Sequence, residues 1–352
     1  MPAAISVKAV DMFCGIGGLS YGLKMAGIPV VAGLDNDPSC RYAYEENCKA
    51  DFVHADVRKS SYSDISSYFD GARYRVLVGC APCQPFSNHT TKAKEFRKND
   101  SRWNLISEYL RFISDGRPEI ISMENVTPLG TKDIYLKFKE SLRALGYHVS
   151  DGIVQCEYLG VPQRRRRLVL LASTLGHISL PEQNRSQPIT VRDSIGHLNH
   201  LVNGQASTVD PIHFCSKLSP VNLKRIQASR QGGTWRDWPE ELLLKCHKKS
   251  TGKTYTCVYG RMSWDSPSPT LTTQFFGYGT GRFGHPEQDR GLSIREGAIL
   301  QSFPEGYQFS RSDEPLSISK LGRHIGNAVP PLLGEAIGRC ILTHLESIDE
   351  DI

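Results

Sequence analysis

Short apolar runs alternate with helical patterns along roughly the first 170 residues, and this alternation restricts the fold more than any other feature of the sequence. Helical patterns include Leu19–Ala26, Asn36–Asn47, Asn104–Ile113 and Ile134–Leu145. The predicted strands are Ile5–Phe13, Val30–Asp35, Phe52–Ala55, Arg75–Gly79, Glu119–Glu124, Tyr147–Gln155 and Leu168–Ala172. Such alternation is typical of an α/β fold with a mainly parallel sheet and helices on both faces. Ligands of these sheets bind at the carboxyl ends of the strands.

The pattern changes near Leu175. Residues 175–290 are rich in Gly, Pro, Ser, His and Asn and show little periodicity, which predicts a smaller, loop-rich second domain. After Pro330 and Pro331, apolar residues return at helical spacing, and proline suits a first helical turn. We expect this last helix to pack on the first domain. The predicted domains are therefore 1–174, completed by 318–352, and 175–317.

The composition is that of an ordinary globular protein, with 39% hydrophobic and 22% charged residues. No window approaches the run of about 18 apolar residues that a membrane span needs, and the first residues lack the features of a signal peptide. We therefore expect a cytoplasmic protein whose ten cysteines form no disulfide framework. Between Asn222 and Arg261, nine Lys/Arg stand against three Asp/Glu, which suits a polyanionic partner.

The segment DMFCGIGGL follows the first predicted strand and opens a helical pattern. Its glycines, Gly15, Gly17 and Gly18, allow the backbone to approach a ligand closely. Acids follow at the ends of the next two strands, where Asp35 could bind ribose hydroxyls and Asp56 an adenine amino group. Turn glycines and helix-capping acids would explain each feature alone. The ordered series favours a nucleoside ligand.

The segment GCAPCQPFS follows the strand Arg75–Gly79 directly, so Cys83 is predicted in a loop at a strand's carboxyl end. Pro82 and Pro85 stiffen this loop on both sides of the cysteine. A thioredoxin-like site would need a helix right after the second cysteine, and a zinc site would need further ligands at suitable spacing. The sequence provides neither. A single nucleophilic thiolate in a rigid loop is the favoured interpretation.

Six segments, in this order, resemble the motifs of DNA (cytosine-5) methyltransferases. The resemblance leaves only about residues 175–265 unmatched, and it implies a Rossmann-like S-adenosylmethionine-dependent methyltransferase fold. The segments are DMFCGIGGL, GCAPCQPFS, MENV (Met123–Val126), QRRRR (Gln163–Arg167), REGAILQSFP (Arg295–Pro304) and GNAVPPLLGEAIG (Gly326–Gly338).

The resemblance implies four catalytic residues. Cys83 would attack carbon 6 of cytosine, and Glu124 would contact ring nitrogen 3 and the exocyclic amine. Arg165 would hold the cytosine carbonyl and the region of the thiolate, with Arg167 as the second family arginine. For Arg164 and Arg166 we expect only phosphate contact. A base inside a duplex hides both faces, so the enzyme must flip it out of the helix.

The same resemblance implies S-adenosylmethionine as the cofactor and implies no metal. Asp35 would take the ribose hydroxyls and Asp56 the adenine. The remaining pocket residues would be Phe13, Gly15, Gly17, Gly18, Val57, Pro82, Leu105 and Asn327. The chain departs from the family pattern at Asp35–Asn36, where Glu and an aromatic residue are frequent. It also departs at Gly297, where cysteine is usual and where we expect an effect on packing only.

The unmatched region should be a target recognition domain. Its segment GGTWR and the later TLTT suggest DNA contacts at Arg236 and Thr272, to which Gln84 and Ser87 of the catalytic loop are added. Trp235 and Trp238 could equally be core residues or DNA contacts. The resemblance implies a monomer that acts on double-stranded DNA in a prokaryotic cell, often paired with a restriction endonuclease.

Three other functions remain to be compared with this one. An RNA cytosine-5 methyltransferase of the same fold would carry a cysteine–phenylalanine–threonine signature in its second domain, which is absent. A nicotinamide-dependent oxidoreductase would have no use for GCAPCQPFS or QRRRR. A DNA-binding protein without catalysis is disfavoured by the intact Cys83, Glu124 and Arg165.

Overall fold

The computed structural model describes residues 5–82, 105–250, 252 and 256–350, which form two compact units. Unit 1 comprises Met1–Leu159, Arg166–Asn184 and Val329–Ile352, and unit 2 comprises Gly160–Arg165 and Arg185–Ala328. Compared with the domains expected from the sequence, unit 2 also holds residues 160–165 and 318–328, and unit 1 also holds residues 175–184. No helix among the described residues is both long and apolar enough to span a membrane.

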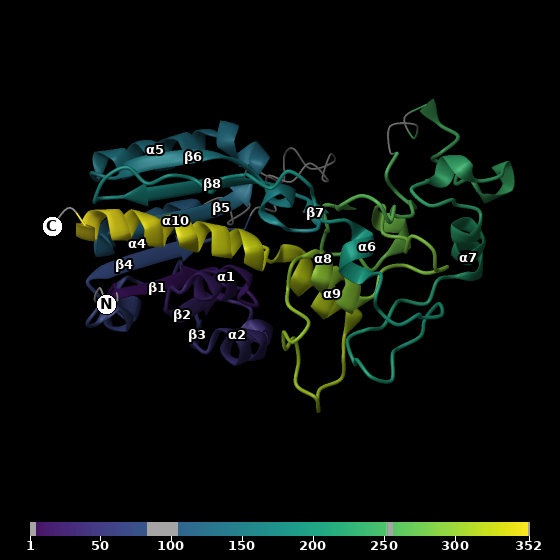
Figure 1. Cartoon of the computed structure of the whole chain (residues 1–352), viewed down its shortest axis with the longest axis horizontal. Coiled ribbons are helices and arrows are strands. Elements are labelled where there is room, and N and C mark those ends of the chain that lie inside the picture. The colour runs from purple at the N-terminus through teal and green to yellow at the C-terminus, as the bar shows by residue number, and fades with distance from the viewer. Residues whose placement is uncertain (1–4, 83–104, 251, 253–255, 351–352) are drawn as a thin grey trace. The chain divides into compact units, whose positions relative to one another are not determined.

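Unit 1 is built on a seven-stranded sheet with the order β3-β2-β1-β4-β5-β8-β6 (Figure 1). Only β8 runs antiparallel to its neighbours. The strands are β1 (Val7–Met12), β2 (Val30–Asp35), β3 (Asp51–His54), β4 (Tyr74–Gly79), β5 (Ile120–Val126), β6 (His148–Gln155) and β8 (Arg166–Ser173). All seven predicted strands are present, with ends within two residues of those expected, and the α/β fold class is confirmed.

Apolar side chains on one face of this sheet join those of the helices that cover it. This core contains fully buried residues such as Leu77, Tyr109, Phe112, Phe138 and Leu170. The helices of unit 1 are α1 (Gly18–Ala26), α2 (Arg41–Cys48), α3 (Ser63–Ser66), α4 (Leu105–Gly116), α5 (Asp133–Ala144) and α10 (Pro331–Glu350). A core of this kind makes the sheet a rigid platform for the loops at its carboxyl edge.

Helix α10 lies along α1, which brings the last segment of the chain beside the first (Figure 1). Glycines permit this close approach. A Cβ on Gly22 would lie 2.2 Å from the carbonyl oxygen of Pro331 and 2.6 Å from the Cα of Gly334. Because α1 starts at the glycine turn, its contact with α10 supports the loop that the sequence assigns to the cofactor.

Unit 2 contains only short elements in its described part, as its composition predicts. Strands β7 (Gln163–Arg164) and β9 (Ser268–Pro269) pair in parallel, and neither was expected from the sequence. The helices are α6 (Val191–Ile195), α7 (Pro220–Gln227), α8 (Ile294–Leu300) and α9 (Ile318–Asn327). Helix α8 begins with a capping box, in which Ser293 and Glu296 exchange side-chain and backbone hydrogen bonds.

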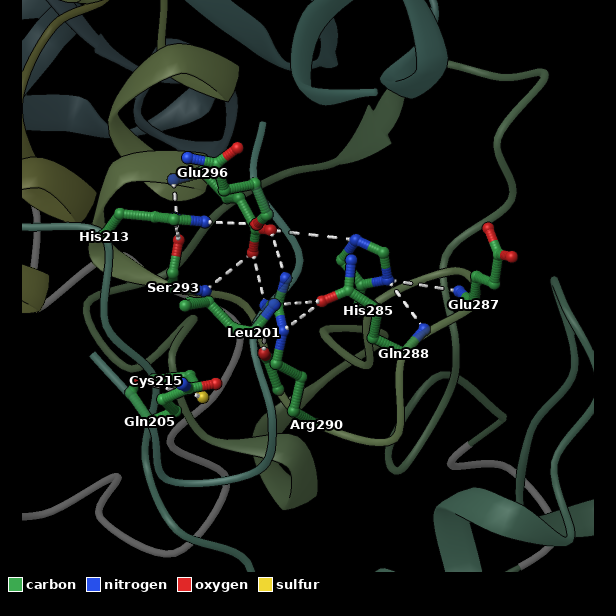
Figure 2. Close-up of polar contacts among 12 residues, drawn as sticks. Leu201, Gln205, His213, Cys215, His285, Glu287, Gln288, Arg290, Ser293 and Glu296 are labelled. Atoms are coloured by element: carbon green, nitrogen blue, oxygen red, sulfur yellow. Dashed lines mark hydrogen bonds and ion pairs between the residues drawn. The ribbon is translucent and has the colours of Figure 1, made fainter. Parts of the chain in front are cut away.

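A buried polar network takes the place of regular structure in unit 2 (Figure 2). Arg290 is fully buried and donates two hydrogen bonds to Glu296, at 2.8 and 2.6 Å. Burial favours the protonated form of Glu296, but the hydrogen bonds and charge of Arg290 outweigh it and lower the pKa to about 2. His285 lies 3.7 Å from the same carboxylate, and burial lowers its pKa to about 3, so it is neutral. His213 extends the network through Ser293.

Aromatic side chains form a second centre of unit 2. Trp235 and Trp238 are both buried, and the ring of His247 stacks on Trp235 at 4.3 Å between centroids. Arg225 lies over the ring of Trp238, where a cation–π contact adds to the packing. Of the two interpretations that the sequence leaves open for these tryptophans, the structure therefore supports the core role.

Candidate active site

The carboxyl edge of the unit 1 sheet holds the glycine turn. Strands β1 and β4 are neighbours at the point where the strand order reverses, which is where such sheets bind ligands. After β1, Phe13, Gly15 and Gly17 adopt left-handed backbone conformations, with φ of 65°, 52° and 89°. A Cβ added to Gly15 would meet no atom within 4 Å, so the turn borders open space. Gly18 begins helix α1.

Asp35 ends β2 and ties the glycine turn to that strand. Its Oδ2 accepts a hydrogen bond from the backbone N–H of Gly15 at 2.8 Å, and its Oδ1 accepts one from Asp37 at 2.9 Å. Burial raises the pKa of Asp35 against the opposing effect of these hydrogen bonds. A carboxylate can accept about four hydrogen bonds. Asp35 therefore has acceptor capacity left for hydroxyl groups.

Asp56 follows β3 and is paired with Arg58. Its carboxylate accepts hydrogen bonds from Nε and Nη2 of Arg58, and these hydrogen bonds lower the pKa of Asp56 to about 2. It is therefore a charged, partly exposed acceptor. Three other residues that the sequence assigns to the cofactor pocket differ in exposure. Val57, next to Asp56, and Leu105, at the start of α4, are buried, whereas Pro82 is half-buried.

Glu124 lies near the end of β5 and is only 2% exposed. Its Oε2 accepts a hydrogen bond from the thiol of Cys80 at 2.8 Å. Its Oε1 lies 2.8 Å from Nε of Arg167, an ion pair without the alignment of a hydrogen bond. Oε1 accepts no hydrogen bond from any residue that the structure describes. A buried oxygen in this state can accept one from a polar ligand.

Strand register explains why these three side chains meet. Gly79 pairs with Met123, so the next residue along β4, Cys80, falls beside Glu124. Val126 pairs with Arg167 across the antiparallel β5–β8 ladder, which makes Arg167 a diagonal neighbour of Glu124 on the same face. The nucleophile predicted from the sequence, Cys83, lies outside the described residues, as do Gln84 and Ser87.

Asn125 connects the two strand ends. Its Nδ2 donates to the carbonyl oxygen of Ala81 at 2.9 Å, and its Oδ1 accepts from the backbone N–H of Val126 at 2.9 Å. It is 1% exposed, so the bonds form in a dry environment. The start of the GCAPCQPFS segment is thus fastened to β5. Sequence reasoning considered Cys80 only as the partner of Cys83 in a CxxC pair and assigned no role to Cys80 or Asn125, although both stand in the motifs that it quoted.

The four consecutive arginines alternate in exposure. Arg164 and Arg166 are exposed, whereas Arg165 is 3% exposed and Arg167 is half-buried. Extended backbone places alternate side chains on opposite sides, so the alternation follows from β7 and β8. Arg165 belongs to unit 2, where its guanidinium donates to Oε1 of Gln163 and to the carbonyl oxygen of Leu271.

Gln163 holds this part of unit 2 together through both ends of its amide. Nε2 donates to Oε1 of Gln301 at 2.7 Å and to the carbonyl oxygen of Leu300, and Oε1 accepts from the backbone N–H of Leu271. Gln301 in turn donates to the carbonyl oxygen of Ala328. The network joins the segments QRRRR, TLTT, REGAILQSFP and GNAVPP, which no spacing in the sequence would predict.

The remaining predicted contacts lie in unit 2 and are spread along it. Arg236 is exposed and lies over the ring of Trp235, Thr272 is half-buried, and Asn327 is the exposed last residue of α9. Gly297 faces the ring of Phe275, which a Cβ would approach to 2.0 Å. The departure from the family pattern at Gly297 therefore has a packing reason.

A doubly wound sheet with a glycine turn at its switch point is the architecture of the α/β proteins that bind nucleotides and related ligands at this edge. Comparison with protein families makes this specific: the C-5 cytosine-specific DNA methylase family matches residues 7–343. The chain belongs to that family and is a DNA cytosine-5 methyltransferase.

Relatives of known identity agree. The chain is 46% identical to the Type II methylase M.HgiDII of Herpetosiphon aurantiacus, with 97% of this chain and 96% of the relative covered. It is 30% identical to the Type II methyltransferase M1.HphI of Haemophilus parahaemolyticus, over 96% of this chain and 87% of the relative. A prophage-encoded DNA modification methyltransferase from E. coli has the same fold, with a TM-score of 0.74, 21% identity and coverage of 97% of this chain and 100% of that chain.

Proposed function

We propose that the chain methylates carbon 5 of a flipped-out cytosine within one short DNA sequence, with Cys83 as the nucleophile and Glu124, Arg165 and Arg167 as its catalytic partners. One observation carries this proposal. Glu124 is buried at the carboxyl edge of the sheet with an oxygen that accepts no hydrogen bond within the described chain, beside the segment that leads to Cys83.

Cytosine is a poor nucleophile at carbon 5, and covalent catalysis overcomes this by dividing one difficult step into easier ones. The Cys83 thiolate forms a bond to carbon 6, and the electron pair of the 5,6 double bond moves to carbon 5 and, through the conjugated 3,4 double bond, to ring nitrogen 3. Glu124, in its protonated form, donates a hydrogen bond or its proton to that nitrogen. Carbon 5, now nucleophilic, would take the methyl group from the sulfonium of S-adenosylmethionine, whose sulfur would keep the electron pair and leave as a neutral thioether. Loss of the proton at carbon 5 to water then returns an electron pair to the 5,6 bond, which expels the Cys83 thiolate from carbon 6 and restores the double bond.

The residues at the glycine turn fit this cofactor. Open space beside Gly15 leaves room for a ligand against the backbone, and the Asp35 carboxylate retains acceptor capacity for ribose hydroxyls. Asp56 would accept from the adenine amine while charged. The pocket would be completed by Phe13, Gly17, Gly18, Val57, Pro82, Leu105 and Asn327. The family takes S-adenosylmethionine, and these residue assignments extend that to the chain.

Double-stranded DNA is the proposed substrate of both units. The exposed guanidinium groups of Arg164 and Arg166 would contact phosphate, which sets affinity and its salt dependence without reading sequence. Arg236 and Thr272 of unit 2, with Gln84 and Ser87, would contact the target site. Arginine at a groove is suited to reading guanine.

A role in restriction–modification follows from the relatives. Two of them carry names of Type II enzymes, which supports a partner endonuclease that cuts the same sequence when it is unmethylated. In that setting the chain would act as a monomer in the cytoplasm of a prokaryotic cell.

The test is to incubate the pure protein with methyl-labelled S-adenosylmethionine and mixed-sequence duplex DNA, and then to sequence the DNA for 5-methylcytosine. We expect label at one cytosine of one short motif, and none with Cys83→Ser, which should still bind the cofactor in calorimetry. If RNA alone were labelled, the substrate would be RNA and not DNA. Label in neither, with DNA still bound, would leave only a DNA-binding protein.

A second test separates the two possible roles of Arg165. Arg165→Ala should lower turnover far more than it lowers DNA affinity, since a buried guanidinium that serves the base acts in the transition state. The exposed Arg164→Ala is the matched control and should weaken DNA binding at low salt with little change in turnover. Loss of affinity alone from Arg165→Ala would assign it to phosphate instead.

A further inference from the structure

Cys80 occupies an unusual position for a side chain without an assigned role. It follows β4 directly, and the strand register sets it beside Glu124. Its sulfur lies 2.8 Å from Oε2 of Glu124, with the thiol as the donor, since a carboxylate can only accept. The side chain is half-buried, so solvent competes weakly for the same bond.

The two oxygens of the Glu124 carboxylate are therefore unequal. Oε2 is engaged by the thiol, whereas Oε1 has the charge of Arg167 nearby but accepts no hydrogen bond among the described residues. Torsion about the last bond of a glutamate is soft. Contacts to both oxygens are therefore needed to hold the carboxylate in one orientation.

We propose that Cys80 is a positioning residue for the methyl transfer reaction: its S–H donates to Oε2 of Glu124 and thereby directs Oε1 toward the cytosine ring. This inference rests on the proposed role of Glu124. It involves no bond breaking at sulfur, and it is separate from the nucleophile Cys83. The thiol works with Arg167, which faces the same carboxylate from β8, so that one neutral and one charged donor group flank it.

Three variants separate donation from packing. Cys80→Ala removes the donor, Cys80→Ser keeps a donor of similar size, and Cys340→Ala removes a thiol from helix α10. Cys340 suits the control because it is also half-buried and also has a carboxylate, Glu182, in its surroundings. We expect Cys80→Ala to lower kcat about fivefold, as for loss of one weak hydrogen bond to a charged group. Its KM values for DNA and cofactor should stay near those of the wild type.

Rescue by the conservative variant provides a readout that a packing defect would not give. Cys80→Ser retains a donor to Oε2 of Glu124 and should keep kcat near the wild-type value. Cys340→Ala should leave kcat unchanged.

An infrared readout does not depend on activity at all. A thiol that donates to a carboxylate has a lowered S–H stretching frequency. The difference spectrum between wild type and Cys80→Ala should contain such a band, and the band should move when Glu124 is replaced by Gln. A band at the frequency of a free thiol would overturn the inference.

The outcomes also separate this inference from the proposed function. A wild-type kcat in Cys80→Ala, with Glu124→Gln inactive, would refute the role of Cys80 and leave that of Glu124 standing. An equal loss in Cys80→Ser and Cys80→Ala would assign the effect to packing. Full activity of Glu124→Gln would refute the proposed role of Glu124, and the inference would fall with it.

Discussion

A single amide side chain, that of Asn125, joins β5 to the segment that follows β4. It donates to the carbonyl oxygen of Ala81 at 2.9 Å from within β5. Replacing it with alanine leaves that carbonyl without this donor and loosens the segment that leads to Cys83. Because small misplacements of a catalytic group are costly, we expect Asn125→Ala to lower kcat at least about tenfold. Steady-state kinetics would measure this, with cofactor affinity unchanged in calorimetry.

Asn47→Ala provides the matched control for this prediction. Asn47 also donates from Nδ2 to a carbonyl oxygen, that of Ala43 at 2.6 Å, but it does so within helix α2. Its loss should leave kcat at the wild-type value. Equal kcat values for the two variants would show that Asn125 does not position the catalytic segment.

Asp11 is a second residue whose role emerges only from the fold. It is buried at the end of β1, and its Oδ2 accepts a hydrogen bond from Ser20 at 2.6 Å. Burial raises the pKa of Asp11 to about 7, with the hydrogen bond from Ser20 opposing the rise and the charge of Asp35 adding to it. The sequence alone marks it only as a polar residue in an apolar strand.

This raised pKa makes a prediction about stability. The folded state binds the proton more tightly than the unfolded state, so the free energy of unfolding falls as pH rises from about 4 to about 7. Asp11→Asn cannot ionise and escapes this loss. The difference in the free energy of unfolding between the variant and the wild type should therefore rise in favour of the variant, by on the order of 2 kcal/mol from pH 5 to pH 8. Urea unfolding at both pH values would measure it.

The exposed Asp70→Asn should show no such gain and serves as the control. A gain for Asp11→Asn that is the same at pH 5 and pH 8 would contradict the raised pKa, because an effect of packing alone does not depend on pH in this range.

At the scale of elements, the contact between α1 and α10 depends on glycine. A Cβ on Gly22 would lie 2.6 Å from the backbone nitrogen of Glu335 and closer still to the carbonyl oxygen of Pro331. Backbone atoms cannot turn aside as a side chain can, so the helices must separate. We expect Gly22→Ala to lower the free energy of unfolding by about 1–3 kcal/mol and to weaken cofactor binding, because α1 begins at the glycine turn.

Gly306→Ala is the control for this substitution, since a Cβ there would meet no atom within 4 Å. It should be neutral or slightly stabilising through the unfolded chain. Urea unfolding and calorimetry with S-adenosylmethionine would compare the two variants. Unchanged stability in Gly22→Ala would mean that α1 and α10 tolerate a wider spacing than the contact implies.

The elements of unit 1 could be predicted because local pattern and fold agree there. Valine and isoleucine mark β1, β2, β4 and β5, and each of these strands lies within two residues of its predicted range. The contacts of Cys80 and Asn125 could not be predicted, because they depend on which strands are neighbours and in which register. The sheet order places β4 beside β5, and no pattern along one strand contains that information.

At the scale of the whole molecule, the chain passes between its two units four times, after residues 159, 165, 184 and 328. Unit 2 was predictable only as loop-rich, since buried charges hold much of it in place of periodic apolar faces. As charged residues, Arg290 and Glu296 would be expected at the surface from the sequence, yet their exposed fractions are only 0% and 1%. Such networks join positions far apart in the chain and have no period to detect.

The buried pair of Arg290 and Glu296 also predicts that a substitution can destabilise unit 2 without unfolding unit 1. Glu296→Gln keeps the capping box of α8 but leaves the charge of Arg290 buried without its counterion. That should cost about 3–5 kcal/mol. Three of the four tryptophans, Trp235, Trp238 and Trp264, lie in unit 2, so their fluorescence during urea unfolding reports its loss.

We expect Glu296→Gln to lose DNA binding together with the stability of unit 2, while S-adenosylmethionine binding, which we propose depends mainly on residues of unit 1, stays near the wild-type value. The double variant Arg290→Met/Glu296→Gln removes the buried charge at similar volume and should recover much of the stability. If cofactor affinity fell as far as DNA affinity in Glu296→Gln, the units would unfold as one. A double variant no more stable than the single one would mean that the hydrogen bonds of Arg290, rather than its buried charge, determine the cost.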